Sequence, residues 1–323
     1  MSNQFALLKT RRFLPLFVVQ ILGAFNDNVF KNAMIILFTY RAAENATIDG
    51  NLLVTIAAGV FILPFFLFSA LAGQIADKFE KSALVRKIKF AEILIMSAGA
   101  AAFYIGNSWL LMGILFMMGT QSAFFGPLKY GILPEHLKEE ELVGGNALID
   151  AATFLAILGG TIGGSLLILR AGGDMAVSIS IISIALLGWL ASLKIPKASI
   201  GDARIQITAN IFRSSYEIIQ HCRQTRAVFL SVMGISWFWL VGAALLVLLP
   251  PLVSDAFNGD ETVVTLLLCA FSIGIGIGSL LCNKILNGEV SAKYAALSLL
   301  FMAGFMTDFA FAVGDYAQSS TAL

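Results

Sequence analysis

The stretch LLVTIAAGVFILPFFLFSALAG, from Leu52 to Gly73, contains no charged residue. A helix needs about 20 apolar residues to cross the hydrocarbon core of a bilayer, so this stretch is long enough to span it. The whole chain of 323 residues is similarly apolar, since 58% of it is hydrophobic and only 13% is charged. Soluble domains are roughly 25% charged. The composition therefore indicates a membrane protein and excludes a cytosolic enzyme, a nucleic-acid binder and a disordered chain.

Nine stretches of this kind predict nine transmembrane helices in an all-α fold. The first is too long for a cleavable signal peptide, carries polar residues in its middle and lacks a small-residue cleavage site. The three cysteines give no disulfide framework. The predicted spans lie near residues 13–40, 52–73, 90–107, 109–126, 143–168, 175–193, 227–252, 263–283 and 294–313.

The basic residues predict the orientation of these spans. The chain has 21 Lys and Arg residues, and all but Lys31, Arg41 and Arg170 precede the first span or follow an even-numbered one. Cytoplasmic loops of membrane proteins carry an excess of Lys and Arg. We therefore expect the N-terminus on the cytoplasmic side of the membrane.

The spans divide the chain into three parts: 1–193 with six helices, a basic linker over 194–226, and 227–323 with three helices. Within the linker, the stretch 205–219 is amphipathic enough for a surface helix. This plan resembles the major facilitator superfamily, whose members have twelve helices in two six-helix halves. Nine predicted helices of an expected twelve indicate a fragment of a longer transporter or a truncated gene product.

The loop after the second span reads GQIADKFEK, residues 73–81, and resembles the superfamily pattern G-x-x-x-D-[RK]-x-x-[RK]. Gly73 would let two helices approach closely. Asp77 would meet a helix N-terminus or a basic partner. Lys78, Lys81 and Arg86 would latch the cytoplasmic face and release it when the two halves rock. An ordinary positive-inside loop is the alternative.

The first span carries polar residues where the bilayer is apolar, because Asp27 lies well inside it with Asn26, Asn28 and Asn32 close by. An ionised group at that depth costs at least ~2.5–3.5 kcal/mol on insertion scales. A polar transport cavity would remove that cost. A structural ion pair between Asp27 and Lys31, one helical turn apart, is the alternative.

Later spans add further candidates. Pro127 and its neighbouring glycines predict a break or kink, where freed backbone and Lys129 would bind an anion such as phosphate; a plain positive-inside lysine is the alternative. Asp150 would pair with a base such as Lys129 or bind a coupling cation, and Glu92 is interpreted as an interfacial anchor. A small-residue face for close helix packing comprises Gly159, Gly160, Gly163 and Gly164.

Several of these runs resemble the bacterial lysophospholipid transporters of this superfamily: AFNDN at 24–28, GQIAD at 73–77, PLKYGIL at 127–133, and Asn146 with Asp150. The resemblance implies a location in the bacterial inner membrane. It also implies flipping of lysophospholipid, typically lysophosphatidylethanolamine, from the outer to the inner leaflet for re-acylation. It implies that Asp27 meets the headgroup amine and Lys129 its phosphate. Similar modules are fused to acyltransferase and acyl-protein ligase domains in some bacteria, so a phospholipid acyltransferase module is a candidate partner. The substrate-binding set is then Asp27, Asn28, Lys31, Lys129 and Asp150.

Other functions remain as alternatives. A general drug or metabolite exporter would have the same fold, and an incomplete second half would give a transport-incompetent fragment. An acyltransferase would need a His with an Asp five positions on, but Glu141 follows His136 at that spacing and Arg226 follows His221. We therefore expect no catalytic residue, cofactor, metal or nucleic-acid partner, and membrane lipids as the surroundings.

Overall fold

A computed structural model describes residues 4–44, 50–208, 210–257 and 261–321. Every regular element in these ranges is a helix, which confirms the predicted all-α fold. The chain divides into two compact units. Unit 1 comprises Met1–Ile218 with Gly276–Gly288, and unit 2 comprises Ile219–Ile275 with Glu289–Leu323.

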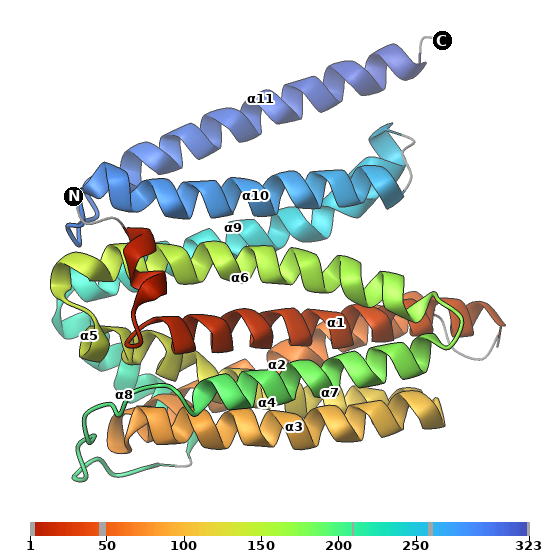
Figure 1. Cartoon of the computed structure of the whole chain (residues 1–323). Coiled ribbons are helices and arrows are strands. Elements are labelled where there is room, and N and C mark those ends of the chain that lie inside the picture. The colour runs from red at the N-terminus through yellow and green to blue at the C-terminus, as the bar shows by residue number, and fades with distance from the viewer. Residues whose placement is uncertain (1–3, 45–49, 209, 258–260, 322–323) are drawn as a thin grey trace. The chain divides into compact units, whose positions relative to one another are not determined.

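Six long helices form the bundle of unit 1. In the bundle α1 packs against α6 and α7, α2 against α4, and α3 against both α4 and α7, and Figure 1 shows these helices running alongside one another. Their bounds are α1 (Leu14–Glu44), α2 (Gly50–Lys78), α3 (Lys81–Ile105), α4 (Ser108–Gly131), α6 (Glu139–Ile168) and α7 (Gly173–Ser192). Short helices lie beside them: η1 (Gln4–Lys9) and α5 (Leu133–His136).

Unit 2 contains α9 (Arg226–Phe257), α11 (Ala295–Thr321) and most of α10 (Glu261–Leu286). Here α9 packs against α11. No residue of the apolar windows in Arg226–Leu245 and Ala295–Tyr316 is buried. Large apolar side chains exposed along whole helices suit contact with lipid tails.

Eight helices in the described ranges are long and apolar enough to cross a membrane. They are α2, α3, α4, α6, α7, α9, α10 and α11. The remaining predicted span, the first one at 13–40, corresponds to α1, which has 31 residues and is therefore long enough. Its middle contains the polar run from Asn26 to Asn32, which lowers the hydropathy of the helix. The low hydropathy of α1 therefore comes from the same polar residues that the sequence marks as candidates for binding.

Two departures from the predicted elements concern helix ends. Pro127 doesn't break its helix, because α4 continues to Gly131 with the proline inside it. The helix ends only where Ile132 donates its N–H to the Leu128 carbonyl and α5 begins. The predicted surface helix over 205–219 is α8, which occupies Ile211–Gln224 instead.

The division between the units falls within α8, inside the predicted linker, and assigns part of α10 to unit 1. The predicted parts 1–193, 194–226 and 227–323 stay a prediction.

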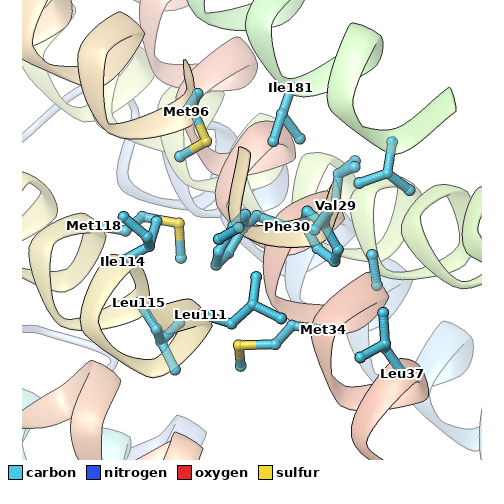
Figure 2. Packing of buried hydrophobic residues seen from close by; sticks show 14 of the residues in the cluster. Val29, Phe30, Met34, Leu37, Met96, Leu111, Ile114, Leu115, Met118 and Ile181 are labelled. Carbon is cyan, nitrogen blue, oxygen red and sulfur yellow. The ribbon is translucent and has the colours of Figure 1, made fainter. Parts of the chain in front are cut away.

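Unit 1 has two separate apolar cores. The larger core gathers side chains from α1, α3, α4 and α7 around Phe30, whose ring meets the Phe103 ring edge-on with centroids 5.4 Å apart. Figure 2 shows Met34, Met96 and Met118 around it, and methionine fills irregular gaps in such cores well. The smaller core surrounds Phe13 and contains buried residues of α1, α4 and α6. The two cores lie toward opposite ends of the same helices.

Candidate functional site

A layer of polar side chains crosses unit 1 between these two cores. Along α1, the buried positions Gln20, Asn26 and Asn28 lie between Val19 of the smaller core and Val29 of the larger one. The same order recurs on α3 and α4, where the buried polar residues between the two cores are Lys89, Glu92 and Gln121. Apart from Gln20, these residues lie near the middle of their helices, the depth at which secondary transporters bind substrates and ions.

Glu92 is the centre of the layer. Its Oε2 accepts hydrogen bonds from Lys89 Nζ at 2.6 Å and from Gln121 Nε2 at 3.1 Å, and its Oε1 accepts one from Asn26 Nδ2 at 3.2 Å. The side chains of Lys89 and Glu92 are each only 2% exposed. The interpretation of Glu92 as an interfacial anchor is therefore wrong, since it joins α1, α3 and α4 inside the bundle.

Lys89 completes this arrangement. Its ammonium lies 4.8 Å from the centroid of the Phe125 ring, and a Cβ at Gly23 would collide with it. A buried charge is tolerated when it is paired and its hydrogen bonds are satisfied. The glycine at position 23 supplies the room that this pair needs.

Asp27 follows Asn26 on α1, but whereas Asn26 bonds to Glu92 on α3, Asp27 bonds to a residue of α4. Its Oδ2 accepts a hydrogen bond of 2.7 Å from Ser122 Oγ on α4. Its Oδ1 is buried and has no hydrogen-bonding partner in the described part of the chain. A carboxylate oxygen buried in this way can accept a hydrogen bond from a ligand cation.

The ion pair between Asp27 and Lys31, the alternative to a transport cavity, is not formed, because neither residue belongs to an ion pair of the described chain. The Lys31 ammonium lies instead 5.1 Å from the centroid of the Phe61 ring on α2. Asn28 also points elsewhere, since its amide donates to the Ala24 carbonyl at 2.8 Å. The three side chains that the sequence groups together therefore contact three different partners.

A second polar group lies further along α4. Tyr130 donates its hydroxyl hydrogen to Asp150 Oδ1 on α6 at 3.0 Å. Lys129 Nζ lies 4.6 Å from the centroid of the Tyr130 ring. Asp150 is thus held by Tyr130, and it forms no ion pair with Lys129 in the described chain. Lys129 follows Ser122 by seven residues, so the two positions share a face of α4 about 10 Å apart along its axis.

The glycine face of α6 packs against α1. A Cβ at Gly160 would collide with the Phe25 carbonyl oxygen, and one at Gly164 would lie 2.9 Å from Val29 Cα. At Gly159 and Gly163 the nearest atoms belong to the Phe25 ring, at 3.3 and 3.6 Å. Two of the four glycines are therefore required by the backbone of α1, which carries Asn26 and Asp27.

The cationic loop residues all contact groups within unit 1. Lys78 Nζ donates to the Ile205 carbonyl at 2.7 Å, and an Arg86 guanidinium nitrogen donates to the Ile195 carbonyl at 3.0 Å. Lys81 forms an ion pair of 2.6 Å with Glu135 on α5. The loop thus binds the start of the linker, and a latch that opens during transport stays a prediction.

Gly73 and Asp77 have no close helix or basic partner among the described residues of unit 1. A Cβ at Gly73 would meet no atom of the described chain within 4 Å, so close helix packing at this glycine stays a prediction. Asp77 is exposed, and its backbone carbonyl accepts a hydrogen bond of 3.0 Å from the Asp202 N–H. The acid that does cap a helix is Glu80, which accepts hydrogen bonds from Ser82 and Ala83 at the start of α3.

Glu80 also binds the linker, because its Oε1 accepts the Ala198 N–H at 2.8 Å. Burial alone would raise the pKa of Glu80. The hydrogen bonds from Ser82, Ala198 and Ala83 outweigh burial and hold that pKa below its ordinary value of 4.5. The segment 195–208, here called the strap, is further fixed by the Ser199 N–H to Glu135 and the Thr208 N–H to Gln74.

Sequence reasoning missed several residues of the polar layer. Lys89 was counted among the cations of a cytoplasmic loop, while Gln121, Ser122 and Tyr130 carried no assignment. Lys89 and Glu92 are three residues apart, which places them on one helix face. This spacing is the sequence signal for the Lys89–Glu92 pair. Within the described ranges, no group of three or more His, Cys, Asp and Glu residues could hold a metal ion.

Comparison with known proteins identifies the family of this polar bundle. The family model of the transmembrane secretion effectors, a branch of the major facilitator superfamily, matches residues 2–318. Lysophospholipid transporter LplT of Escherichia coli strain SE11 is 31% identical over 291 residues, which cover 88% of this chain and 68% of the relative. The chain belongs to the lysophospholipid transporter family of the major facilitator superfamily.

Other relatives in this transporter family agree. LplT of Escherichia coli O1:K1 is 30% identical over 293 residues, and LplT of Shigella boydii serotype 4 is 30% identical over 291, each with the same coverage. No solved structure matches the chain. Together with the apolar helices, these relatives make the chain a multi-pass inner-membrane protein of a transporter family.

Proposed function

We propose that this protein moves lysophospholipid, with lysophosphatidylethanolamine as the preferred substrate, across the bacterial inner membrane by alternating access. The amine of the headgroup binds Asp27 and the phosphate binds Lys129. The structural observation behind the proposal is the buried Oδ1 of Asp27, which has no hydrogen-bonding partner in the described chain. The relatives, which are named as lysophospholipid transporters, support the same substrate class.

The charges of the site match a zwitterion. Asp27 offers a carboxylate in the middle of the bundle, and Lys129 offers an ammonium on the face of α4 that carries Ser122. Side chains on a helix lean toward its N-terminus, so Lys129 leans toward Ser122 and Asp27. A lipophilic cation needs only the carboxylate, and an anionic lipid needs only the lysine. A zwitterionic headgroup uses both.

Three further residues support this site. Tyr130 holds Asp150 by a hydrogen bond of 3.0 Å and places its ring beside the Lys129 ammonium. Lys31 lies over the Phe61 ring and can neutralise part of the negative charge around Asp27. Asn28 packs against α6, where a Cβ at Gly160 would lie 3.0 Å from its Cβ, so its role is to fix α1 in place.

The test is uptake of labelled lysophosphatidylethanolamine by proteoliposomes that contain the full chain. Loss of a hydrogen bond between charged groups costs about 1.5–3 kcal/mol, so Asp27→Asn should raise KM roughly 10- to 100-fold. Lys129→Gln should raise KM similarly for lipids that carry phosphate. Asp308→Asn and Lys293→Gln change a carboxylate on α11 and a lysine outside the helices, and both should leave uptake unchanged.

The same vesicles separate the alternatives. Uptake equal to that of empty liposomes would refute the lysophospholipid proposal. Ethidium movement without lysolipid movement would instead indicate a drug exporter, and movement of neither would indicate a transport-incompetent fragment.

Two finer points belong to this proposal. A coupling cation would compete with the amine at Asp27 or bind at Asp150, so an imposed proton or sodium gradient should change the initial rate. The N-terminus lies in the cytoplasm beside the basic loops, where a phospholipid acyltransferase could receive the lipid. A cysteine introduced at Lys9 should then resist an impermeant thiol reagent in intact spheroplasts and react after lysis.

A further inference from the structure

Glu92 and Lys89 lie behind the proposed headgroup site, and their contacts bear on it directly. Asn26 and Asp27 are consecutive residues of α1, and Gln121 and Ser122 are consecutive residues of α4. Asn26 and Gln121 both donate to Glu92, while Ser122 donates to Asp27. Two parallel sets of bonds therefore join α1 to α4, one through Glu92 and one through Asp27.

We propose that Glu92, paired with Lys89, is a positioning residue that fixes the Asp27 carboxylate for the headgroup amine. The inference rests on the proposed function. Glu92 makes no contact with the substrate in this scheme. It holds the residues that precede Asp27 and Ser122 in the chain, and so sets the rotation of α1 against α4 at the depth of the site.

The donors and acceptors around Glu92 explain why a carboxylate is needed. Both oxygens accept, one from Asn26 and the other from Lys89 and Gln121. A glutamine has one carbonyl oxygen and one NH2 group, and the NH2 group only donates. In Glu92→Gln the NH2 group must therefore face one of these donors. Turning it toward Asn26 gives up one bond of 3.2 Å, whereas turning it toward Lys89 and Gln121 gives up two shorter bonds. Asn26 is then released next to Asp27.

The location of the pair makes a purely stabilising role a poor explanation. A buried ion pair seldom stabilises a fold more than apolar residues of similar size would. The two apolar cores already hold these three helices together on either side of the layer. The hydrogen bonds of Glu92 extend to both neighbours of the Asp27–Ser122 contact, which apolar residues couldn't replace.

Infrared spectroscopy of the reconstituted full chain tests the proposal without needing transport. With ¹³C-labelled aspartate, the carboxyl band of Asp27 is the band that disappears in Asp27→Asn. Glu92→Gln should shift this band. Gln20→Leu removes a matched buried amide on α1, which donates to Thr153 at 2.9 Å, and should leave the band in place. An unmoved band in Glu92→Gln, or an equal shift in Gln20→Leu, overturns the proposal.

Lysolipid uptake supplies the second readout. Glu92→Gln should raise KM about tenfold, the effect of one lost bond to a charged group, with an unchanged maximal rate. In the Asp27→Asn background the same change should add nothing; an equal further rise would overturn the proposal. If Glu92→Gln misfolds, the double variant Lys89→Met with Glu92→Gln carries no unpaired charge and should show the same band shift.

The two hypotheses fail separately. If the wild-type chain moves no lysolipid, the proposed function fails, and the infrared band of Asp27 still decides whether Glu92 positions it.

Discussion

The contact between α6 and α1 gives the sharpest prediction of stability. In Gly164→Ala, the new Cβ would lie 2.9 Å from Val29 Cα and 3.0 Å from Val29 C, and it would collide with the Val29 carbonyl oxygen. These are backbone atoms, so no side-chain rotation relieves the overlap. Overpacking of this kind costs typically 1–3 kcal/mol, against a gain of about 1 kcal/mol from replacing glycine by alanine in a helix.

Gly163→Ala is the matched control. Its Cβ would meet only the Phe25 ring, at 3.6 Å, which is an ordinary van der Waals distance. This variant should equal the wild type or exceed it by up to ~1 kcal/mol. We therefore expect Gly164→Ala to fall about 1–3 kcal/mol below Gly163→Ala in its free energy of unfolding.

The assay is titration with sodium dodecyl sulfate from mild detergent, with helix loss followed by circular dichroism. The quantity compared is the difference in unfolding free energy between the two alanine variants, which cancels the helix propensity they share. Equal unfolding curves for Gly164→Ala and Gly163→Ala would refute the conclusion that α1 backbone fills the space above Gly164. Gly164→Ala should also lower lysolipid uptake, because the new Cβ displaces α1, which carries Asp27. Gly163→Ala should leave uptake unchanged.

Three further predictions concern charged groups. Glu80→Gln should speed hydrogen exchange at the Ala198 amide, measured by mass spectrometry, because that N–H donates to Glu80; unchanged exchange would contradict the strap. The folded-state pKa of Glu80 is lowered from 4.5, so its stabilisation is present above pH 4.5 and lost as the pH falls through the lowered value. Wild type and Glu80→Gln should therefore differ in melting temperature at neutral pH and converge once the pH falls below the lowered pKa of Glu80. Lys89→Met should lower the melting temperature more than Lys89→Met with Glu92→Gln, since only the single variant leaves a buried charge unpaired; the reverse order would contradict that pairing.

The membrane fold could be predicted because the thickness of the bilayer sets the length of apolar sequence that a spanning helix needs. A run such as Leu52–Gly73 reads as a span wherever its neighbours lie. The glycine face of α6 could also be predicted from the sequence alone, because small residues four apart indicate a close helix contact. The spacing does not indicate which helix makes that contact. That the partner is α1, at Phe25 and Val29, required the structure.

The pairing of polar residues could not be predicted, because helix spacing gives neighbours within a helix and not between helices. Asp27 and Lys31 are a favourable pair by spacing, yet the carboxylate bonds to Ser122 on α4 and the ammonium lies over Phe61 on α2. Hydrogen bonds to other helices decide such cases where the bundle is tight.

Lys89 and Glu92 illustrate a further limit. Near the predicted start of a span, a lysine and a glutamate look like interfacial residues, since each could reach water. In the structure α3 begins at Lys81, so Lys89 is already two turns inside the helix and the pair lies between the two apolar cores. The error in the helix start therefore became an error in function. A charged pair at that depth, with donors from α1 and α4 converging on it, costs more than an apolar contact of similar size. A role in the site beside it would explain why the pair is there. This cost is the physical reason to look for the role of Glu92 at Asp27.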